Sequence, residues 1–237
     1  HIRNLHGVRP HLYHYPQQSL LPEEHHETRW LADRTVEFLN RQRKKPFFLV
    51  CGWIKPHPPW DIPERWLDAY KDTELPEPVP TSRRFPYWEP ESDWYGDNDS
   101  EELKRRIRKA YFTSVSLVDE SMGRILKQLE DTGQLDNTLI ILTSDHGEML
   151  QDKGFYSKQL PYESSARIPF VVRYPKRFEP GSVRDHFVDL LDIFPTVLEE
   201  TGVPYHYKDS DRAYELDGAH VLDAQGVKDR EYQWIEN

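Results

Sequence analysis

Cysteine is nearly absent from the chain, because Cys51 is the only one among 237 residues. A disulfide within the chain is therefore impossible, and a small disulfide scaffold or a cysteine-rich zinc site is excluded. Basic residues are also in deficit, since 31 Lys and Arg face 41 Asp and Glu and give a net charge of −10. This balance argues against non-specific binding to nucleic acid or to anionic membranes, both of which require a basic surface.

Long apolar runs are missing as well. No stretch approaches the ~18 residues that a membrane span requires, and no signal peptide is visible. Aromatic residues, by contrast, make up 13% of the chain, which separates it from disordered sequences. At this length one large domain or two small ones are expected. The first residue is His1 rather than Met, as expected of a processed chain or a piece of a longer protein.

Hydrophobic periodicity predicts three helices, over residues 23–43, 100–131 and 189–201. Short continuous apolar runs predict buried strands over residues 46–53, 138–143 and 169–174. The helix over residues 100–131 has the clearest signal, because Asp99 or Ser100 can cap its start and Gly133 can end it. Strands that alternate with helices predict an α/β fold with a mostly parallel sheet sandwiched by helices.

Residues 61–99 interrupt this alternation with a long surface excursion. The segment is acidic and rich in proline, and loops of this length are usually functional or disordered. Four aromatic side chains favour a partly ordered segment that can bind a ligand: Tyr87, Trp88, Trp94 and Tyr95.

Lys55 and His57 follow the strand predicted over residues 46–53. Ligands of open α/β sheets bind at the carboxyl ends of the strands, so both side chains are candidates for chemistry. Prolines on both sides hold the backbone of His57 rigid, which suits a proton-transfer group or an anion contact. A surface histidine and an ordinary solvated lysine are the alternatives.

Asp145 and His146 follow the strand predicted over residues 138–143, and both could reach one metal ion. Alternatively, Asp145 caps a turn that Gly147 makes possible. Lys158 comes thirteen residues after Asp145, and a lysine returned to the sheet edge could neutralise an anionic substrate. Otherwise Lys158 is a surface residue.

An ordered set of motifs connects these candidates. Its members are T-S-D-H-G at 143–147, G-F-Y-S-K at 154–158, Y-E-S-S-A-R-I-P at 162–169, P-F-F-L leading to P-H at 46–57, D-L-L-D-I-F-P-T at 189–196 and L-D-G at 216–218. Each motif is moderately specific, and the ordered set is strong. The set resembles the sulfatase family of the alkaline phosphatase superfamily, in particular iduronate-2-sulfatase and bacterial glycosaminoglycan sulfatases.

The resemblance implies an alkaline phosphatase-like fold that is incomplete at both ends. Residues 1–237 would then be part of one catalytic domain, with residues 61–99 as the excursion and residues 203–237 as the start of the C-terminal region. The family resemblance also favours a periplasmic, secreted or lysosomal location.

The same resemblance implies hydrolysis of sulfate esters, with a sulfated sugar or glycosaminoglycan as substrate. Asp145 and His146 would bind a divalent cation, normally Ca²⁺, although many members have Asn in place of His146 and calcium prefers oxygen ligands. Lys158 would bind the sulfate and take part in catalysis. His57 would contact the sulfate or protonate the leaving oxygen, and Lys55 would add positive charge for substrate binding.

Two family features are missing from the chain. The formylglycine motif C/S-x-P-x-R does not occur, because Cys51 is followed by G-W-I-K, and Cys51 is interpreted as a buried strand residue. The early Asp-Asp metal pair does not occur either. We therefore expect an interior part of an enzyme that is inactive alone, with the formylglycine supplied by the remaining N-terminal part. The alternatives are a phosphodiesterase or phosphonate monoester hydrolase of the same superfamily, and a non-catalytic or carbohydrate-binding relative.

Overall fold

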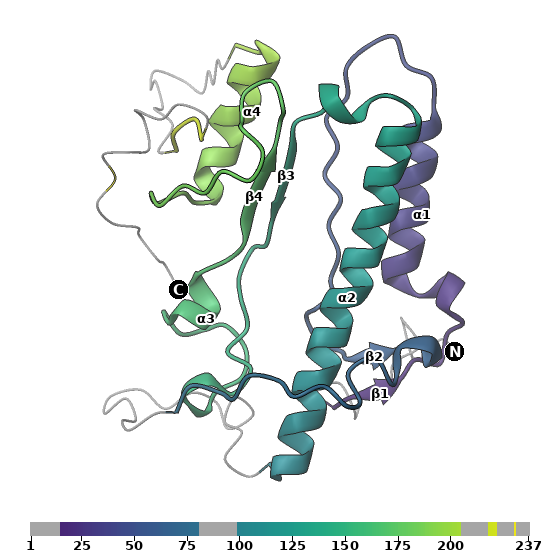
Figure 1. Cartoon of the computed structure of the whole chain (residues 1–237), viewed down its shortest axis with the longest axis vertical. Coiled ribbons are helices and arrows are strands. Elements are labelled where there is room, and N and C mark those ends of the chain that lie inside the picture. The colour runs from purple at the N-terminus through teal and green to yellow at the C-terminus, as the bar shows by residue number, and fades with distance from the viewer. Residues whose placement is uncertain (1–14, 81–98, 205–217, 222–229, 231–237) are drawn as a thin grey trace, which may run out of the picture. The chain divides into compact units, whose positions relative to one another are not determined.

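The computed structural model describes residues 15–80, 99–204, 218–221 and 230 (Figure 1). The chain divides into two compact units, of which the first holds residues 1–137 and 148–158 and the second holds residues 138–147 and 159–237. Each unit has helices and a pair of strands of its own. The four aromatic residues singled out in the excursion lie outside the described residues.

Helix α2, Glu101–Asp131, is the longest element of the first unit. Ser100 caps its start, because the Ser100 hydroxyl accepts a hydrogen bond from the Leu103 amide at 3.2 Å. Gly133 ends it with a φ of +67°, a left-handed conformation that glycine adopts without a steric penalty. The predicted start and end are both confirmed.

Helix α1, Glu27–Asn40, lies beside α2 (Figure 1). It buries one face at helical spacing, through Thr28, Ala32, Thr35 and Leu39. The helix is shorter than the predicted 23–43, because His26 caps it and Glu23–His25 form a separate 3-10 turn. The face that packs inward therefore consists of three small or β-branched residues and one leucine.

The strands of the first unit are short. β1, Gln17–Gln18, pairs in parallel with β2, Asp61–Ile62. The buried side chains that pack around this pair come from β2 and the residue before it, from α2 and from the 148–158 segment: Trp60, Ile62, Ile107, Ala110 and Leu150. This core joins the start of the 61–99 excursion to the N-terminal third of α2.

The segment predicted as a buried strand over residues 46–53 forms no strand in the structure. Two of its odd-numbered residues contact α1: the Phe47 and Phe38 rings meet edge to face, and the Cys51 sulfur lies 3.2 Å from the Thr35 hydroxyl. Its even residues face outward, with Val50 76% exposed. The prediction of a strand over residues 46–53 was wrong, because within the described residues no strand pairs with this backbone. Cys51 is half-buried, and burial raises the pKa of its thiol.

In the second unit, β3, Ile140–Thr143, pairs antiparallel with β4, Phe170–Arg173. Both predicted strands are confirmed, although their side chains are partly rather than fully buried. The unit also contains the short α3, Glu163–Ala166, and α4, Ile193–Thr201. Pro195 stands in the first turn of α4, where its missing amide costs no helical hydrogen bond.

Asp192, directly before α4, has a buried carboxylate that accepts four hydrogen bonds. Arg230 donates to both of its oxygens at 2.7 and 2.8 Å, and the amides of Asp189 and Ala219 donate at 2.9 and 2.7 Å. Burial raises the pKa of the Asp192 carboxyl, but Arg230 and the two amides outweigh it and hold the pKa below its ordinary value. The ionised carboxylate therefore stabilises the fold.

Asp192→Asn should lower the free energy of unfolding at pH 7 by roughly 3–5 kcal/mol, because Arg230 loses a buried charged partner. Since the folded pKa is lowered, this stabilisation is present above the unfolded pKa of about 3.9 and is lost as the pH falls below it. Urea unfolding should therefore separate the variant from the parent at pH 7 and less at pH 3.5. The exposed Asp72→Asn serves as the control, and an equal difference at both pH values would contradict the prediction.

Within the described ranges, no helix is long and apolar enough to cross a membrane.

Candidate active site

His57 stands in a tightly closed loop of the first unit. The His57 amide donates to the Ile54 carbonyl at 3.0 Å, and the Trp60 indole donates to the Pro56 carbonyl at 3.1 Å. The ring nitrogen Nδ1 of His57 lies 2.6 Å from the Pro58 carbonyl. These contacts fix both the backbone and the imidazole ring of a half-buried histidine.

Lys158 meets His57 although the two residues are 101 positions apart: Nζ of Lys158 lies 3.2 Å from Nε2 of His57. An ammonium group can only donate, so Nε2 must accept, and the proton of the ring then belongs on Nδ1, facing the Pro58 carbonyl. The sequence-based prediction that these two side chains converge is confirmed. Their roles toward an anion stay predictions.

The segment 148–158 carries Lys158 in a constrained conformation. Leu150, Gln151, Lys153 and Ser157 all have positive φ, at 43°, 78°, 59° and 71°. Non-glycine residues adopt this region at an energetic cost, and such residues concentrate at functional sites. The surrounding contacts must therefore hold the segment in place.

Glu148 supplies part of that support. Its carboxylate accepts hydrogen bonds from the amides of Ser157 at 2.6 Å and Leu150 at 3.2 Å, and the Met149 amide bonds the Ser157 carbonyl at 2.8 Å. Met149 itself is fully buried. Sequence reasoning missed Glu148, and the available signal was an acid directly after the D-H-G motif.

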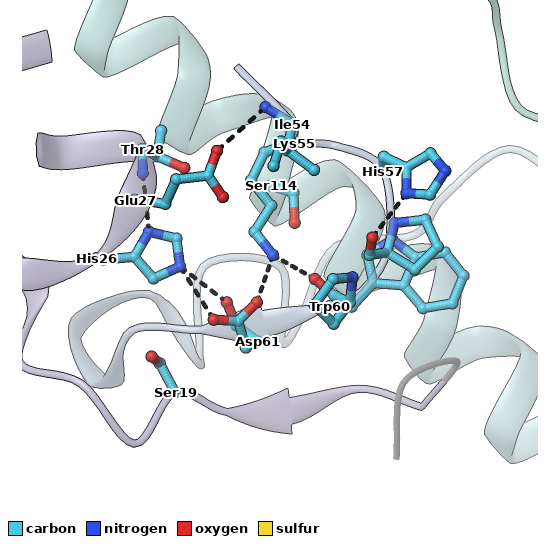
Figure 2. Close-up of polar contacts among 12 residues, drawn as sticks. Ser19, His26, Glu27, Thr28, Ile54, Lys55, His57, Trp60, Asp61 and Ser114 are labelled. Carbon is cyan, nitrogen blue, oxygen red and sulfur yellow. Dashed lines mark hydrogen bonds and ion pairs between the residues drawn. The ribbon is translucent and has the colours of Figure 1, made fainter. Parts of the chain in front are cut away.

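Lys55, predicted to bind substrate, is turned into the protein. Its side chain is 3% exposed, and its ammonium donates to the Asp61 carboxylate and to the Pro59 carbonyl (Figure 2). His26 also contacts Asp61, because its Nε2 lies 3.3 Å from the Asp61 carboxylate. Sequence reasoning missed both Asp61 and His26, because neither belongs to a recognisable motif.

Burial raises the pKa of the Asp61 carboxyl, but the hydrogen bond from His26 and the charge of Lys55 outweigh it and leave the pKa below its ordinary value. His26 uses its other nitrogen, Nδ1, to accept the Thr28 amide at the start of α1. Asp61 is therefore the centre of a buried polar network that links α1 to the His57 loop (Figure 2).

Asp145 and His146 follow β3 in the second unit, as predicted. Asp145 is 82% exposed at its side chain, and one of its oxygens lies 3.6 Å from Nε2 of His146. The other oxygen accepts the His146 amide at 3.0 Å, while Nδ1 of His146 lies 2.7 Å from the Gly147 carbonyl. Nδ1 therefore carries the ring proton, and the lone pair of Nε2 is on the side of the carboxylate.

This arrangement fits two ligands of one cation, because donors at metal distances of about 2.0–2.6 Å lie a little over 3 Å apart. Nowhere in the described part of the chain do three or more His, Cys, Asp and Glu side chains gather as a metal site. Asp145 and His146 would therefore supply part of a ligand set.

Gly147 is required by packing within the same turn. Its amide donates to the Ser165 carbonyl at 2.7 Å, and a Cβ at this position would stand 2.1 Å from the Ser164 carbonyl oxygen. Any side chain would push the segment 144–147 away from α3. The third residue of the D-H-G motif thus keeps the first two in their observed positions.

Comparison with known proteins identifies the family. The sulfatase family model matches residues 5–203. The chain belongs to the sulfatase family. An arylsulfatase of Clostridium perfringens is 34% identical over 196 residues, which is 75% of this chain and 38% of that protein. Iduronate 2-sulfatase of Mus musculus is 27% identical over 216 residues, covering 73% of this chain and 39% of that protein.

Among solved structures, a phosphonate monoester hydrolase from Silicibacter pomeroyi has a TM-score of 0.72 at 24% identity, covering 92% of this chain and 44% of that one. This likeness shows the fold, and the α/β, alkaline phosphatase-like prediction is confirmed. The sulfatase chain spans less than two fifths of the length of both curated relatives named above. Sulfatases are generally metal-dependent, which agrees with the donor geometry of Asp145 and His146.

Proposed function

We propose that the protein containing this chain hydrolyses sulfate esters, with a sulfated sugar as the substrate class. The observation that carries the proposal is the contact between His57 and Lys158, two polar side chains from distant segments held in fixed positions. The family match supports sulfate as the group that is cleaved. The name of the mouse relative supports a sulfated sugar.

Lys158 provides a fixed positive charge for the sulfate oxygens, which are anionic before and during the reaction. When a sulfate oxygen accepts the hydrogen bond that Lys158 now donates to Nε2, Nε2 of His57 is left facing the substrate. With Nε2 protonated from solvent, the His57 imidazolium can then give that proton to the leaving ester oxygen and return to its neutral Nδ1–H form. The Pro58 carbonyl holds the Nδ1 proton throughout, so the ring keeps its orientation.

Asp145 and His146 are the residues proposed to hold the divalent cation, with Ca²⁺ as the proposed ion. A carboxylate suits calcium, and an imidazole is also a common ligand of softer divalent metals. Bound there, a divalent cation would supply positive charge to an anionic ester. The nucleophile is proposed to be a formylglycine supplied by sequence outside this chain.

The proposal is tested by comparing leaving-group-matched substrates in the full-length protein. Initial rates should be measured with 4-nitrophenyl sulfate, 4-nitrophenyl phosphate and 4-nitrophenyl phenylphosphonate after metal loading. A kcat/KM for the sulfate that exceeds the other two supports the proposal. Preference for the phosphonate would favour the related hydrolase activity, and no turnover of any ester would favour a non-catalytic relative.

The described ends of the 61–99 excursion are both bound to the segment that carries Lys158. The Val79 amide donates to the Asp152 carboxylate at 2.8 Å, and the Tyr156 hydroxyl donates to the Asp99 carboxylate at 3.0 Å. Burial, followed by the charge of Asp99, raises the pKa of the Tyr156 hydroxyl well above its usual range, so it stays a donor at neutral pH. These contacts support the proposal that the excursion contributes to substrate choice.

Replacing residues 81–95 by a short Gly-Ser linker should therefore change the ratio of kcat/KM among sulfated sugars. Turnover of 4-nitrophenyl sulfate should stay within a few-fold of the parent, because Val79 and Asp99 are kept. An unchanged ranking of the sulfated sugars in a folded variant would remove the excursion from substrate selection.

A further inference from the structure

The side chain of Lys55 connects the backbone before His57 to the backbone after it. Lys55 stands two residues before the histidine, and its Nζ donates to the carbonyl of Pro59, two residues after it (Figure 2). The same Nζ donates to the carboxylate of Asp61, four residues after it. The Lys55 side chain thus closes residues 55–59 into a ring that has His57 at its apex.

The position of this ammonium does not suit a substrate ligand. The side chains of Lys55 and Asp61 are each 3% exposed, and two of the three ammonium protons are already directed at protein oxygens. A buried ion pair persists only where both charges find partners, because removal from water is expensive. Asp61 therefore holds the lysine where it is.

His26, the residue that caps α1, anchors the pair of Lys55 and Asp61. Nε2 of His26 lies 3.3 Å from the Asp61 carboxylate and 3.3 Å from its backbone carbonyl. Since Nδ1 of His26 accepts the Thr28 amide, the network fastens the start of α1 to β2. The end of the His57 loop is thereby fixed to the helical part of the first unit.

We propose that Lys55 is a positioning residue, which, anchored by Asp61, holds the 55–59 loop closed and so keeps the His57 imidazole directed at Lys158. The inference rests on the proposed function, in which His57 acts on the substrate. It replaces a direct role of Lys55 in substrate binding.

The test is a double-mutant cycle between the lysine and His57 in the full-length protein. Lys55→Met is combined with Asp61→Asn, so that no buried charge is left unpaired and the carboxamide oxygen can still accept from His26. In the parent background this pair of changes should lower kcat on a sugar sulfate roughly 10- to 100-fold, with KM changed less than about 3-fold. In a His57→Ala background the same changes should cost less than about 3-fold.

A second measurement does not depend on activity. In the ¹⁵N-labelled protein, the His57 ring should show the Nδ1–H tautomer in the parent and a mixture of tautomers in the Lys55→Met, Asp61→Asn protein. The His57→Ala protein identifies the signal. Lys45→Met, at an exposed position ten residues earlier, is the matched control and should change neither measurement.

The outcomes separate the two proposals. An equal loss in both backgrounds, or a rise in KM with kcat unchanged, would show that Lys55 meets the substrate itself and would overturn the positioning role. An unchanged His57 tautomer in the folded variant would overturn it as well. If His57→Ala alone leaves turnover of a sugar sulfate unchanged, the proposed function fails, and the ring spectrum still decides whether Lys55 positions His57.

Discussion

Replacing His57 by alanine in the full-length protein should lower kcat for an alkyl or sugar sulfate by about 10²–10⁴, the usual contribution of a general acid. The expectation follows from the ring geometry, in which the Pro58 carbonyl holds Nδ1 and Nε2 faces Lys158. KM should change little, because Lys158 still provides the charge that binds the sulfate. Steady-state kinetics on one sulfate ester measures both values.

The loss should shrink for esters with good leaving groups, since these need little protonation as they depart. The expected pattern is a large effect on a sugar sulfate and a small one on 4-nitrophenyl sulfate. His25→Ala, an exposed histidine on another segment, is the control and should leave both rates unchanged. An equal loss with both classes of ester would show that His57 binds the sulfate and does not act as an acid.

Asp145→Ala should remove the divalent cation from the full-length protein. The carboxylate is the charged member of the Asp145 and His146 pair, and its loss leaves the charge of the cation poorly balanced. Metal content after dialysis, measured by mass spectrometry, should fall from near one ion per chain to background, and Asp145→Asn should retain an intermediate amount.

The matched control for this experiment is Asp185→Ala, an exposed acid in the same unit. It should keep the full metal content. A normal metal content in Asp145→Ala would show that Asp145 is not a ligand, whatever the effect on activity. Because metal content is measured directly, this result does not depend on knowing the substrate.

Local sequence predicted elements whose determinants are local. The cap at Ser100, the periodic face of α2 and the left-handed Gly133 all lie within a few residues of the boundaries that they set. The 46–53 segment depends instead on a partner strand, because an apolar run acquires strand hydrogen bonds only when another backbone lies beside it. Its sequence alone contains no information about that partner.

The candidate site divides in the same way. The meeting of His57 and Lys158 could be predicted because ordered motifs marked both residues. The burial of Lys55 could not be predicted, because a lysine that pairs with a buried acid and a lysine that faces a ligand look alike in sequence. The left-handed residues of 148–158 escaped notice for a related reason. Leu, Lys and Ser rarely adopt positive φ, so the sequence gives no sign that the backbone does so at Leu150, Lys153 and Ser157.

The attachment of both described ends of the excursion to residues 152–156 has a consequence for how this protein can diversify. When the two ends of a segment are fixed to the same support, a change in its length alters only the entropy of closing a loop, and each doubling costs about 0.6 kcal/mol. Insertions and deletions between Val79 and Asp99 should therefore be tolerated without displacing Lys158. Under the proposed function, the excursion would act as an exchangeable module, in which substrate preference changes while His57 and Lys158 keep their geometry.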